Sequence, residues 1–514
     1  MKKTSYILLL TALLGLSTTG CNDMLNPQPV GTQTLDNTFT DFAGTISAVN
    51  GLYSNLSGGN LYRGNMALMN IDQASDDVMN DSRIASAAYS QIDYFELPAD
   101  NGLTYDIWDG LYRTIFRSNV VIGRVPDLNL PAVQNRNSAG LSFTNQFIGE
   151  AKFMRAFAYF NLVRLFGDVP FRTGEIKSPL EVNIPRTPTA QIYAQIIDDL
   201  KDAATKLPPS TSGSGVGNER GRPLRWAALT MLADVYLTQR NWAEARTTAA
   251  QVITQSGLNL NPRYADNFVA RGGSENSGES LFEVQFSNGG AAAGTAGLGN
   301  PYSFVMGATT ETNGGNPSLG GYRPTDNTSP DNEPGFSGGL IQEYEEGDLR
   351  RDVTFIRGLA GGGIQRWLTI KHHVPGTGSV GQANFPIYRL AETLLIYAEA
   401  ANEAGTLDAP GLDYLNRLRR RAFGLPLATP SATRDVASGL SQAQYRDLIR
   451  AERRKELAME NKRWFDLVRY GFDFTNTALK VNQKRDGFTR DRMLFPIARI
   501  EVVNNPLITQ NPGY

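Results

Sequence analysis

Several segments of this 514-residue chain carry apolar residues three or four positions apart, and this spacing constrains the fold more than any other feature. Residues with this spacing share one face of an α-helix, whereas a half-buried strand requires alternation. The segments that show it are 39–53, 108–122, 150–165, 187–200, 225–253, 389–421 and 442–470. The sequence therefore predicts a mainly α fold with helices at both ends.

The segment 225–253 predicts two antiparallel helices in close contact. Leu232 and Tyr236 fall on one helix, and small residues, Ala245 and Ala249, recur on the next. This pattern resembles a tetratricopeptide (TPR) hairpin, in which small residues let two helices approach each other. Segments 389–421 and 442–470 repeat the plan. We therefore expect an α-superhelix of TPR-like helix pairs.

A loop-rich block, 259–385, interrupts these helices. It has ten glycines between residues 288 and 322. Within it, segment 280–286 alternates its side chains and predicts a short strand. Loops longer than about 15 residues in a compact domain are usually functional or disordered. This block also carries aromatic residues, Tyr302, Phe304, Tyr322 and Trp367, which favours a functional role. We therefore expect a large loop-rich insert with a few short strands that contributes to function.

The only cysteine, Cys21, follows a positively charged start and a short apolar run, Tyr6–Leu16. That run is too short to cross a bilayer, which takes about 20 apolar residues, and has the size of a secretory signal core. Thr19-Gly20-Cys21 resembles a lipobox, which implies that residues 1–20 are a signal peptide and that Cys21 carries the lipid, with palmitate-type acyl chains. An ordinary secretory signal with a chance cysteine is the alternative. Residues 21–36 would then form a tether.

Charge and motif content narrow the classes of function. Lys plus Arg (49) balance Asp plus Glu (51), for a net charge of -2, which argues against a nucleic-acid-binding protein. The two histidines, His372 and His373, have no cysteine partner for a zinc site. Phosphate-loop, nucleophile-elbow and zinc-protease motifs are missing from the sequence. We therefore predict no metal, no cofactor and no enzymatic activity.

A binding protein for sugars needs aromatic faces and a few polar groups in a concave site. The candidate ligand-binding residues in loop segments are Asp77, Arg83, Tyr89, Tyr302, Tyr322 and Trp367. The other tryptophans, which we assign to the core, are Trp108, Trp226, Trp242 and Trp464. In the segment 449–471 acids and bases interleave, which predicts ion pairs at i,i+4 along one helix rather than a nucleic-acid surface.

Six segments, read in order, resemble the SusD/RagB family. They are "CNDMLNPQP", "EAKFMRAFAYFNLVRLFGDVPF", "FPIYRLAETLLIYAEAANEAG", "LNRLRRRA", "RRKELAMENKRWFDLVRYG" and "LFPIARIEVVNNPLITQNPGY". The resemblance implies an N-terminal helical region at 37–258 and a C-terminal region at 259–514, the latter with the insert 259–385 and TPR-like helices at 386–471. It also implies that ligand contacts come from segments 71–94 and 291–367.

The same resemblance implies a function and a location. Family members are nutrient-binding lipoproteins of the cell outer membrane that lie as a lid on a SusC-like TonB-dependent β-barrel transporter. They capture a glycan or oligosaccharide and deliver it unchanged. We therefore expect a surface-exposed, lipid-anchored carbohydrate-binding protein. A peptide-binding family member and an all-α enzyme acting on polysaccharide are the alternatives.

Overall fold

The computed structural model describes thirteen stretches of the chain. They are residues 35–58, 60–63, 68–80, 87–127, 142–210, 221–268, 272–286, 322–329, 332, 334–360, 364–372, 383–405 and 407–514. The chain divides into two units, one ending at Ser47 and one running from Ala48 to Tyr514. In the first unit, α3 (Leu35–Thr38) precedes the start of α4 (Phe42–Gly58), where the Asp41 carboxylate accepts a hydrogen bond from the Gly44 amide.

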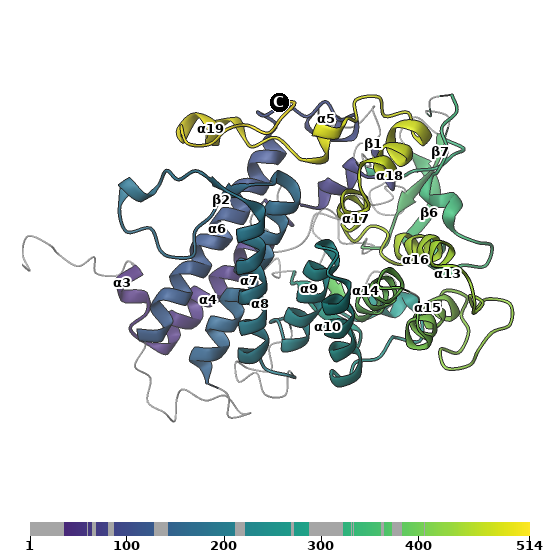
Figure 1. The fold of residues 1–514 in the computed structure, drawn as a ribbon, viewed down its shortest axis with the longest axis horizontal. Coiled ribbons are helices and arrows are strands. Elements are labelled where there is room, and N and C mark those ends of the chain that lie inside the picture. Colours follow the sequence, from purple (N-terminus) through teal and green to yellow (C-terminus); the bar gives the residue numbers. More distant parts are fainter. Residues whose placement is uncertain are drawn as a thin grey trace, which may run out of the picture. The chain divides into compact units, whose positions relative to one another are not determined.

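The long helices of the second unit pack against one another in chain order. They are α6 (Gly102–Arg124), α7 (Phe143–Phe166), α8 (Thr189–Lys206), α9 (Arg225–Thr238), α10 (Trp242–Gln255), α14 (Leu390–Glu403), α15 (Ala409–Ala422) and α16 (Gln442–Glu456). Each of α6 to α10 contacts the next, α10 contacts α14, and α14 contacts both α15 and α16 (Figure 1). This succession of helix pairs confirms the mainly α fold that the periodicity predicts.

Helix α7 packs between α6 and α8 and also contacts α9. Ser142 caps its first turn, and Gly167 ends it in a left-handed conformation with φ of 72°. Its apolar stripe is wider than the spacing predicts, because α6, α8 and α9 all contact it and nearly every side chain from Phe153 to Phe166 is buried. A helix that is apolar on all sides is typical of a protein core.

Shorter helices and strands lie between the long helices, in the loop-rich block 259–385 and after α16. The short helices are α5 (Ala87–Asp93), α12 (Leu340–Glu343), α13 (Leu349–Thr354), α17 (Arg463–Tyr470), α18 (Phe472–Asn476) and α19 (Arg499–Asn504). The strands are β1 (Val78–Asn80), β2 (Val169–Pro170), β3 (Arg186–Thr187), β4 (Ser280–Val284), β5 (Tyr322–Pro324), β6 (Phe355–Ala360), β7 (Ile364–Thr369) and β8 (Phe385–Arg389).

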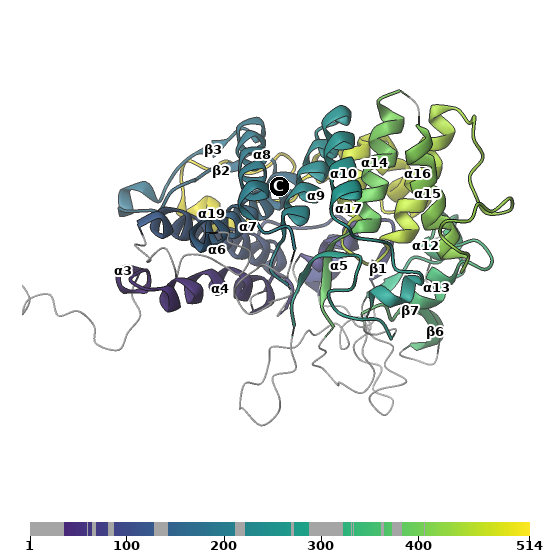
Figure 2. The same cartoon turned by 90° about the horizontal axis from the view of Figure 1, so that it is seen from below.

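These strands form four antiparallel pairs: β1–β5, β2–β3, β4–β8 and β6–β7. The predicted strand at 280–286 is confirmed as β4, although it ends at Val284 and residues of both of its faces are buried. The pairs β1–β5 and β6–β7 lie together beyond the ends of helices α14 to α16 (Figure 2). None of the described helices is both long and apolar enough to cross a bilayer.

The tryptophans mostly fill the core as predicted. Trp108, Trp226 and Trp464 are buried, but Trp242 at the start of α10 is only half-buried. The reason is its position: Trp242 begins α10 directly after the exposed residues 239–241.

Candidate ligand-binding site

Strands β1, β5, β6 and β7 form a small strand platform. In the β1–β5 pair, Val78 lies opposite Pro324 and Asn80 opposite Tyr322, and β5 also contacts β7. The platform therefore brings together the two segments, 71–94 and 291–367, that the family resemblance implies for ligand contacts. The paired residues Val78 and Pro324 are 246 positions apart in the sequence, and strand pairing joins them.

Trp367 lies on the outward face of the platform. Its neighbours in β7, Arg366 and Leu368, lie on the opposite face of the strand and are buried, whereas Trp367 is half-buried. The guanidinium carbon of Arg351 lies 5.6 Å from the centroid of the indole, and the exposed Arg357 lies opposite it in β6. The ring is therefore supported by arginines and partly open to solvent.

Tyr89 lies on α5, which packs against β1. Its side chain is half-buried and hydrogen-bonds with that of Asn70, and burial raises the pKa of its hydroxyl. Asn70 itself is almost fully buried, at 1% exposure. This hydrogen bond fixes the ring of Tyr89 at the β1 side of the platform.

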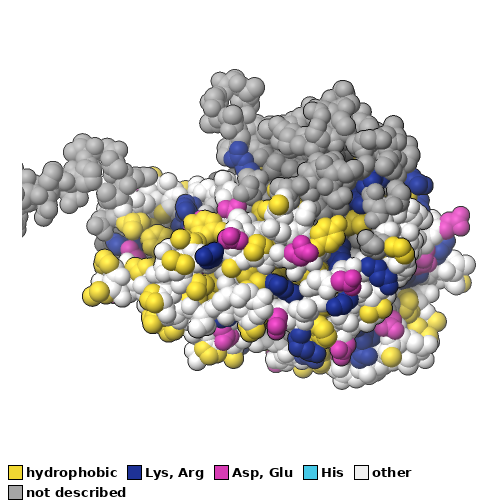
Figure 3. Space-filling model, turned by 90° about the horizontal axis from the view of Figure 1, so that it is seen from above, with side chains coloured by type: hydrophobic (Ala, Val, Ile, Leu, Met, Phe, Trp, Pro, Cys, Tyr) yellow, Lys and Arg dark blue, Asp and Glu magenta, His cyan; other side chains and the backbone are white. Residues whose placement is uncertain are grey.

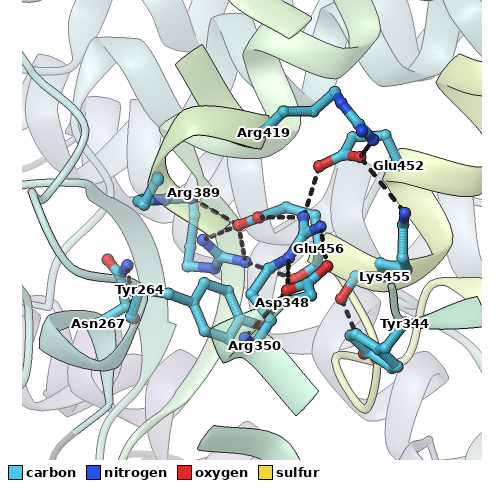
Figure 4. A network of polar contacts seen from close by, with 12 residues as sticks. Tyr264, Asn267, Tyr344, Asp348, Arg350, Arg389, Arg419, Glu452, Lys455 and Glu456 are labelled. Atoms are coloured by element: carbon cyan, nitrogen blue, oxygen red, sulfur yellow. Dashed lines mark hydrogen bonds and ion pairs between the residues drawn. The ribbon is translucent and has the colours of Figure 1, made fainter. Parts of the chain in front are cut away.

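A buried ion-pair network holds the hairpin that carries Trp367. Arg350, in α13 just before β6, is fully buried and donates to the carboxylates of Asp348 (2.7 Å), Glu452 (2.6 Å) and Glu456 (3.2 Å). Figure 4 shows Glu456 lying between the arginines, with Arg389 on its other side. Because both glutamates belong to α16, this helix fixes where the β6–β7 hairpin begins.

The same helix holds β1 through Arg454. Its guanidinium donates to the Asp77 carboxylate and to the Asp76 carbonyl, while Arg463 makes a two-pronged contact with the Asp76 carboxylate at 2.7 and 2.8 Å. Burial by itself would raise the pKa of Asp76, but the charges of Arg454 and Arg463 outweigh it and lower that pKa. One charged helix therefore positions both strand pairs of the platform.

This network corrects two predictions. Asp77, predicted to contact ligand, is 2% exposed, and its carboxylate is bound by Arg454, so it supports the site from beneath rather than facing a ligand. The charges of segment 449–471 mostly pair with other elements instead of forming i,i+4 pairs along their own helix: Arg453 contacts Glu392 on α14 and Asp466 on α17. The reason is that this helix is surrounded by neighbours, so its charges lie inside the protein.

Cys21, Arg83 and Tyr302 lie outside the described residues, and for Tyr322 only the backbone, in β5, is described. The structure therefore places Trp367 on the platform and Tyr89 beside it, and it places the backbone of Tyr322 in one of the platform strands. Arg351 is not predictable from the sequence, since one more arginine in a charged run gives no sign that it lies over an indole.

Three further features of the described residues bear on the chemistry of the site: the histidine His372, the potential metal ligands and the surface charges. His372 is buried, its Nε2 lies 3.2 Å from the Met459 carbonyl, and burial together with the Lys371 charge lowers its pKa to about 3. In the parts of the chain that the structure describes, no group of three or more metal-ligating side chains comes together. On the face seen in Figure 3, basic and acidic side chains are interspersed rather than gathered into a patch of one sign.

The described residues also enclose three sizeable cavities. One of about 440 Å³ lies between α6 and α19, and one of about 370 Å³ lies beside Trp226 and β4. The largest of the three, about 580 Å³, lies between α16 and α18 and includes Asp76 and Gly338 in its lining. All three fall within the range of small-molecule sites, about 300–1,000 Å³.

Comparisons with known proteins identify one family over nearly the whole chain. The profile of the SusD family matches residues 236–514, and a second profile, described as starch-binding associating with outer membrane, matches residues 36–237. SusD-like protein P2 of Formosa agariphila is 28% identical over 100% of this chain and 99% of its own length.

Solved structures share the fold. A SusD homolog from Bacteroides thetaiotaomicron superposes with a TM-score of 0.79 at 20% identity, covering 94% of this chain and 99% of that one. A laminarin-binding SusD-like protein superposes with a TM-score of 0.72 at 24% identity, covering 92% of this chain and 100% of that one.

Proposed function

The chain belongs to the SusD family, and from that membership we propose that it captures a glycan and delivers it, chemically unchanged, to a TonB-dependent β-barrel transporter in the outer membrane. The observation that carries the glycan assignment is Trp367, a half-buried indole supported by Arg351 on a hairpin fixed by buried ion pairs. An aromatic face beside polar groups suits the apolar C–H side of a sugar ring and its hydroxyls.

The relatives support the same ligand class. One structure with this fold is a laminarin-binding protein, and the profile that matches residues 36–237 is described as starch-binding. That description also includes association with the outer membrane, which agrees with lipid attachment at Cys21. A platform open to solvent, with few stacked rings, should bind at micromolar affinity or weaker, about 8 kcal/mol at most. Such affinity allows the cargo to be released.

Calorimetric titration of the full mature chain tests this function. The panel contains laminarin, amylopectin, xylan and a casein digest. We expect saturable heat with at least one polysaccharide and no new reducing ends after overnight incubation. Binding of peptides alone would support the peptide alternative, and a steady rise in reducing ends would support an enzyme.

The transporter is tested in the source cells. An affinity-tagged chain is purified from outer membranes under mild detergent, and the co-purifying proteins are identified by mass spectrometry. We expect a large TonB-dependent β-barrel in stoichiometric amount. Its absence from both detergent extracts and cross-linked samples would contradict the delivery step.

A further inference from the structure

The cavity of about 580 Å³ has features that the platform does not use. Its walls come from α16, α18 and the π-helical turn Thr477–Asn482, and none of its lining residues belongs to β6 or β7. Helices α16, α17 and α18 lie close together at this point (Figure 1). The cavity is therefore separate from the Trp367 surface.

Arg450, on α16, contributes a planar guanidinium to the wall. Its guanidinium carbon lies 4.0 Å from the ring centroid of Tyr470 and 5.0 Å from that of Phe474. Its Nε is buried and makes no hydrogen bond, and no carboxylate in the described part of the chain pairs with it. Contact with two aromatic rings restrains the guanidinium, and its N–H donors make no hydrogen bond with the described residues.

The other two arginines of the cavity differ from Arg450 in this respect. Arg454 is bound to Asp77 and Glu343, and Arg463 to Asp76. Their charges are therefore already compensated inside the protein. Arg450 remains as the available donor in this lining.

Acceptors complement that donor at the mouth of the cavity. Asp447 lies one turn before Arg450 on α16, and Asp473 lies on α18; both are exposed. Across the ranges that the structure describes, neither carboxylate makes an ion pair or a side-chain hydrogen bond. Phe474 beside them is half-buried and presents part of an aromatic ring. The mouth thus offers hydrogen-bond acceptors, a planar donor and an apolar face together.

The charges that line the cavity favour a neutral ligand over an anionic one. Four carboxylates and three arginines line the cavity, so an anionic ligand gains no net attraction there. A hydroxyl both donates and accepts, so vicinal hydroxyls can bridge a carboxylate and a guanidinium. The C–H face of a sugar ring would lie on the aromatic side chain.

We propose that this cavity is a second saccharide-binding site that takes a neutral hexopyranose unit, with Arg450, Asp447 and Asp473 binding its hydroxyls and Phe474 contacting its ring. The saccharide class rests on the proposed function, whereas the neutral charge rests on the residues of the cavity itself. The site would hold part of a glycan away from the platform, so one chain could make two contacts with a polymer.

Saturation-transfer NMR on the full mature chain tests the proposal with three probes. They are methyl β-D-glucoside, which is neutral, methyl β-D-glucuronide, which is anionic, and the dipeptide Gly-Gly. We expect binding of the glucoside at millimolar concentration and a weaker signal from the glucuronide. Arg450→Ala and Asp447→Asn should each lower glucoside affinity at least about tenfold, as loss of a hydrogen bond to a charged group does.

Control variants keep the outcome decisive. Arg113→Ala removes an exposed arginine of α6 and should change nothing, whereas Trp367→Ala should weaken polysaccharide binding and leave the part of the glucoside signal that comes from the cavity. Asp447 is exposed and unpaired, so Asp447→Asn tests the site even if Arg450→Ala lowers stability.

The proposal is overturned if wild type shows no glucoside signal, if Arg450→Ala and Asp447→Asn bind as wild type does, or if the glucuronide or Gly-Gly binds better. Polysaccharide titration reports on the platform separately. A chain that binds polysaccharide through Trp367 but ignores the glucoside would therefore refute the cavity site and leave the proposed function intact.

Discussion

The Nε of Arg454 donates a hydrogen bond of 2.6 Å to the carboxylate of Asp77, joining two residues that are 377 positions apart in the sequence. Both side chains are buried, and Asp77 directly precedes β1. The contact therefore ties the N-terminal part of the ligand platform to a helix near the C-terminus.

Removal of this arginine should be costly. Arg454→Met leaves Asp77 buried without its partner, and breaking a buried ion pair on one side typically destabilises a protein by about 3–5 kcal/mol. We expect a loss of that order in chemical denaturation. Arg113→Met is the control, because the exposed Arg113–Asp109 pair should contribute at most about 1 kcal/mol. Equal effects of the two substitutions would show that the Arg454 network does not hold the fold.

The helices of this fold can be predicted from the sequence, whereas the partners of the buried ion pairs cannot. Helix α16 is predictable because its apolar spacing and its capping box, Ser441 with Gln444, are local features. The partners of its charges are not, since Arg454 and Glu456 bind residues far along the chain. The prediction that Asp77 contacts ligand is wrong for this reason: two adjacent acids in a polar stretch suggest a solvated loop, and only the folded chain brings arginines to them.

The candidate site likewise contains residues that the sequence predicts and residues that it does not. The aromatic content of the loop-rich block and the family resemblance point to Trp367, and the structure leaves it half-buried in β7. Nothing in the sequence around Arg450 or Arg351 indicates that each would lie beside aromatic rings from other elements. Such pairings depend on packing between segments, which periodicity does not report.

His372 should make the protein sensitive to acid. Its folded-state pKa is about 3, lowered from 6.5 by burial and by the Lys371 charge. Below pH 6.5 the imidazole of His372 is therefore protonated in the unfolded chain but stays neutral in the folded chain. The free energy of unfolding consequently falls as pH falls from 6.5 towards 3. One proton corresponds to at most about 1.4 kcal/mol per pH unit. His372→Gln should flatten this dependence, and both proteins should have the same slope near pH 7.5. An unchanged slope between pH 4 and 6 would contradict the assignment.

Asp72 should have the opposite dependence. Burial, and secondarily the Asp77 charge, raises its pKa to about 8, and its Oδ1 has no hydrogen-bond partner among the described residues. The folded state then retains a proton that the unfolded state has lost above about pH 4, so this contribution to stability declines as pH rises to 8. Asp72→Asn keeps an acceptor for the Asn461 amide and removes the titration. We expect the melting temperature of the variant, relative to wild type, to be higher at pH 8 than at pH 5; a difference independent of pH would refute this.

Cys21 should carry the membrane anchor. Each buried lipid methylene contributes about 0.8 kcal/mol, so several acyl chains give stable attachment. Cys21→Ser should therefore abolish palmitate labelling and move the protein out of the membrane fraction. Mass spectrometry of the mature N-terminus checks the result directly. An unmodified Cys21, or a mature chain that begins elsewhere, would contradict the anchor.

Trp367 should contribute to binding rather than to stability. Its ring is half-buried on the platform, and its main described ring contact is the Arg351 guanidinium, an interaction of about 0.5–1 kcal/mol at exposed sites. Trp367→Ala should therefore lower polysaccharide affinity about tenfold while changing the free energy of unfolding by no more than about 1 kcal/mol. Trp242→Ala is the matched control, because that indole is also half-buried but lies on α10. Calorimetric titration and thermal melting of both variants decide the matter: a large loss of melting temperature in Trp367→Ala would make the indole a packing residue, and unchanged affinity would remove it from the ligand site.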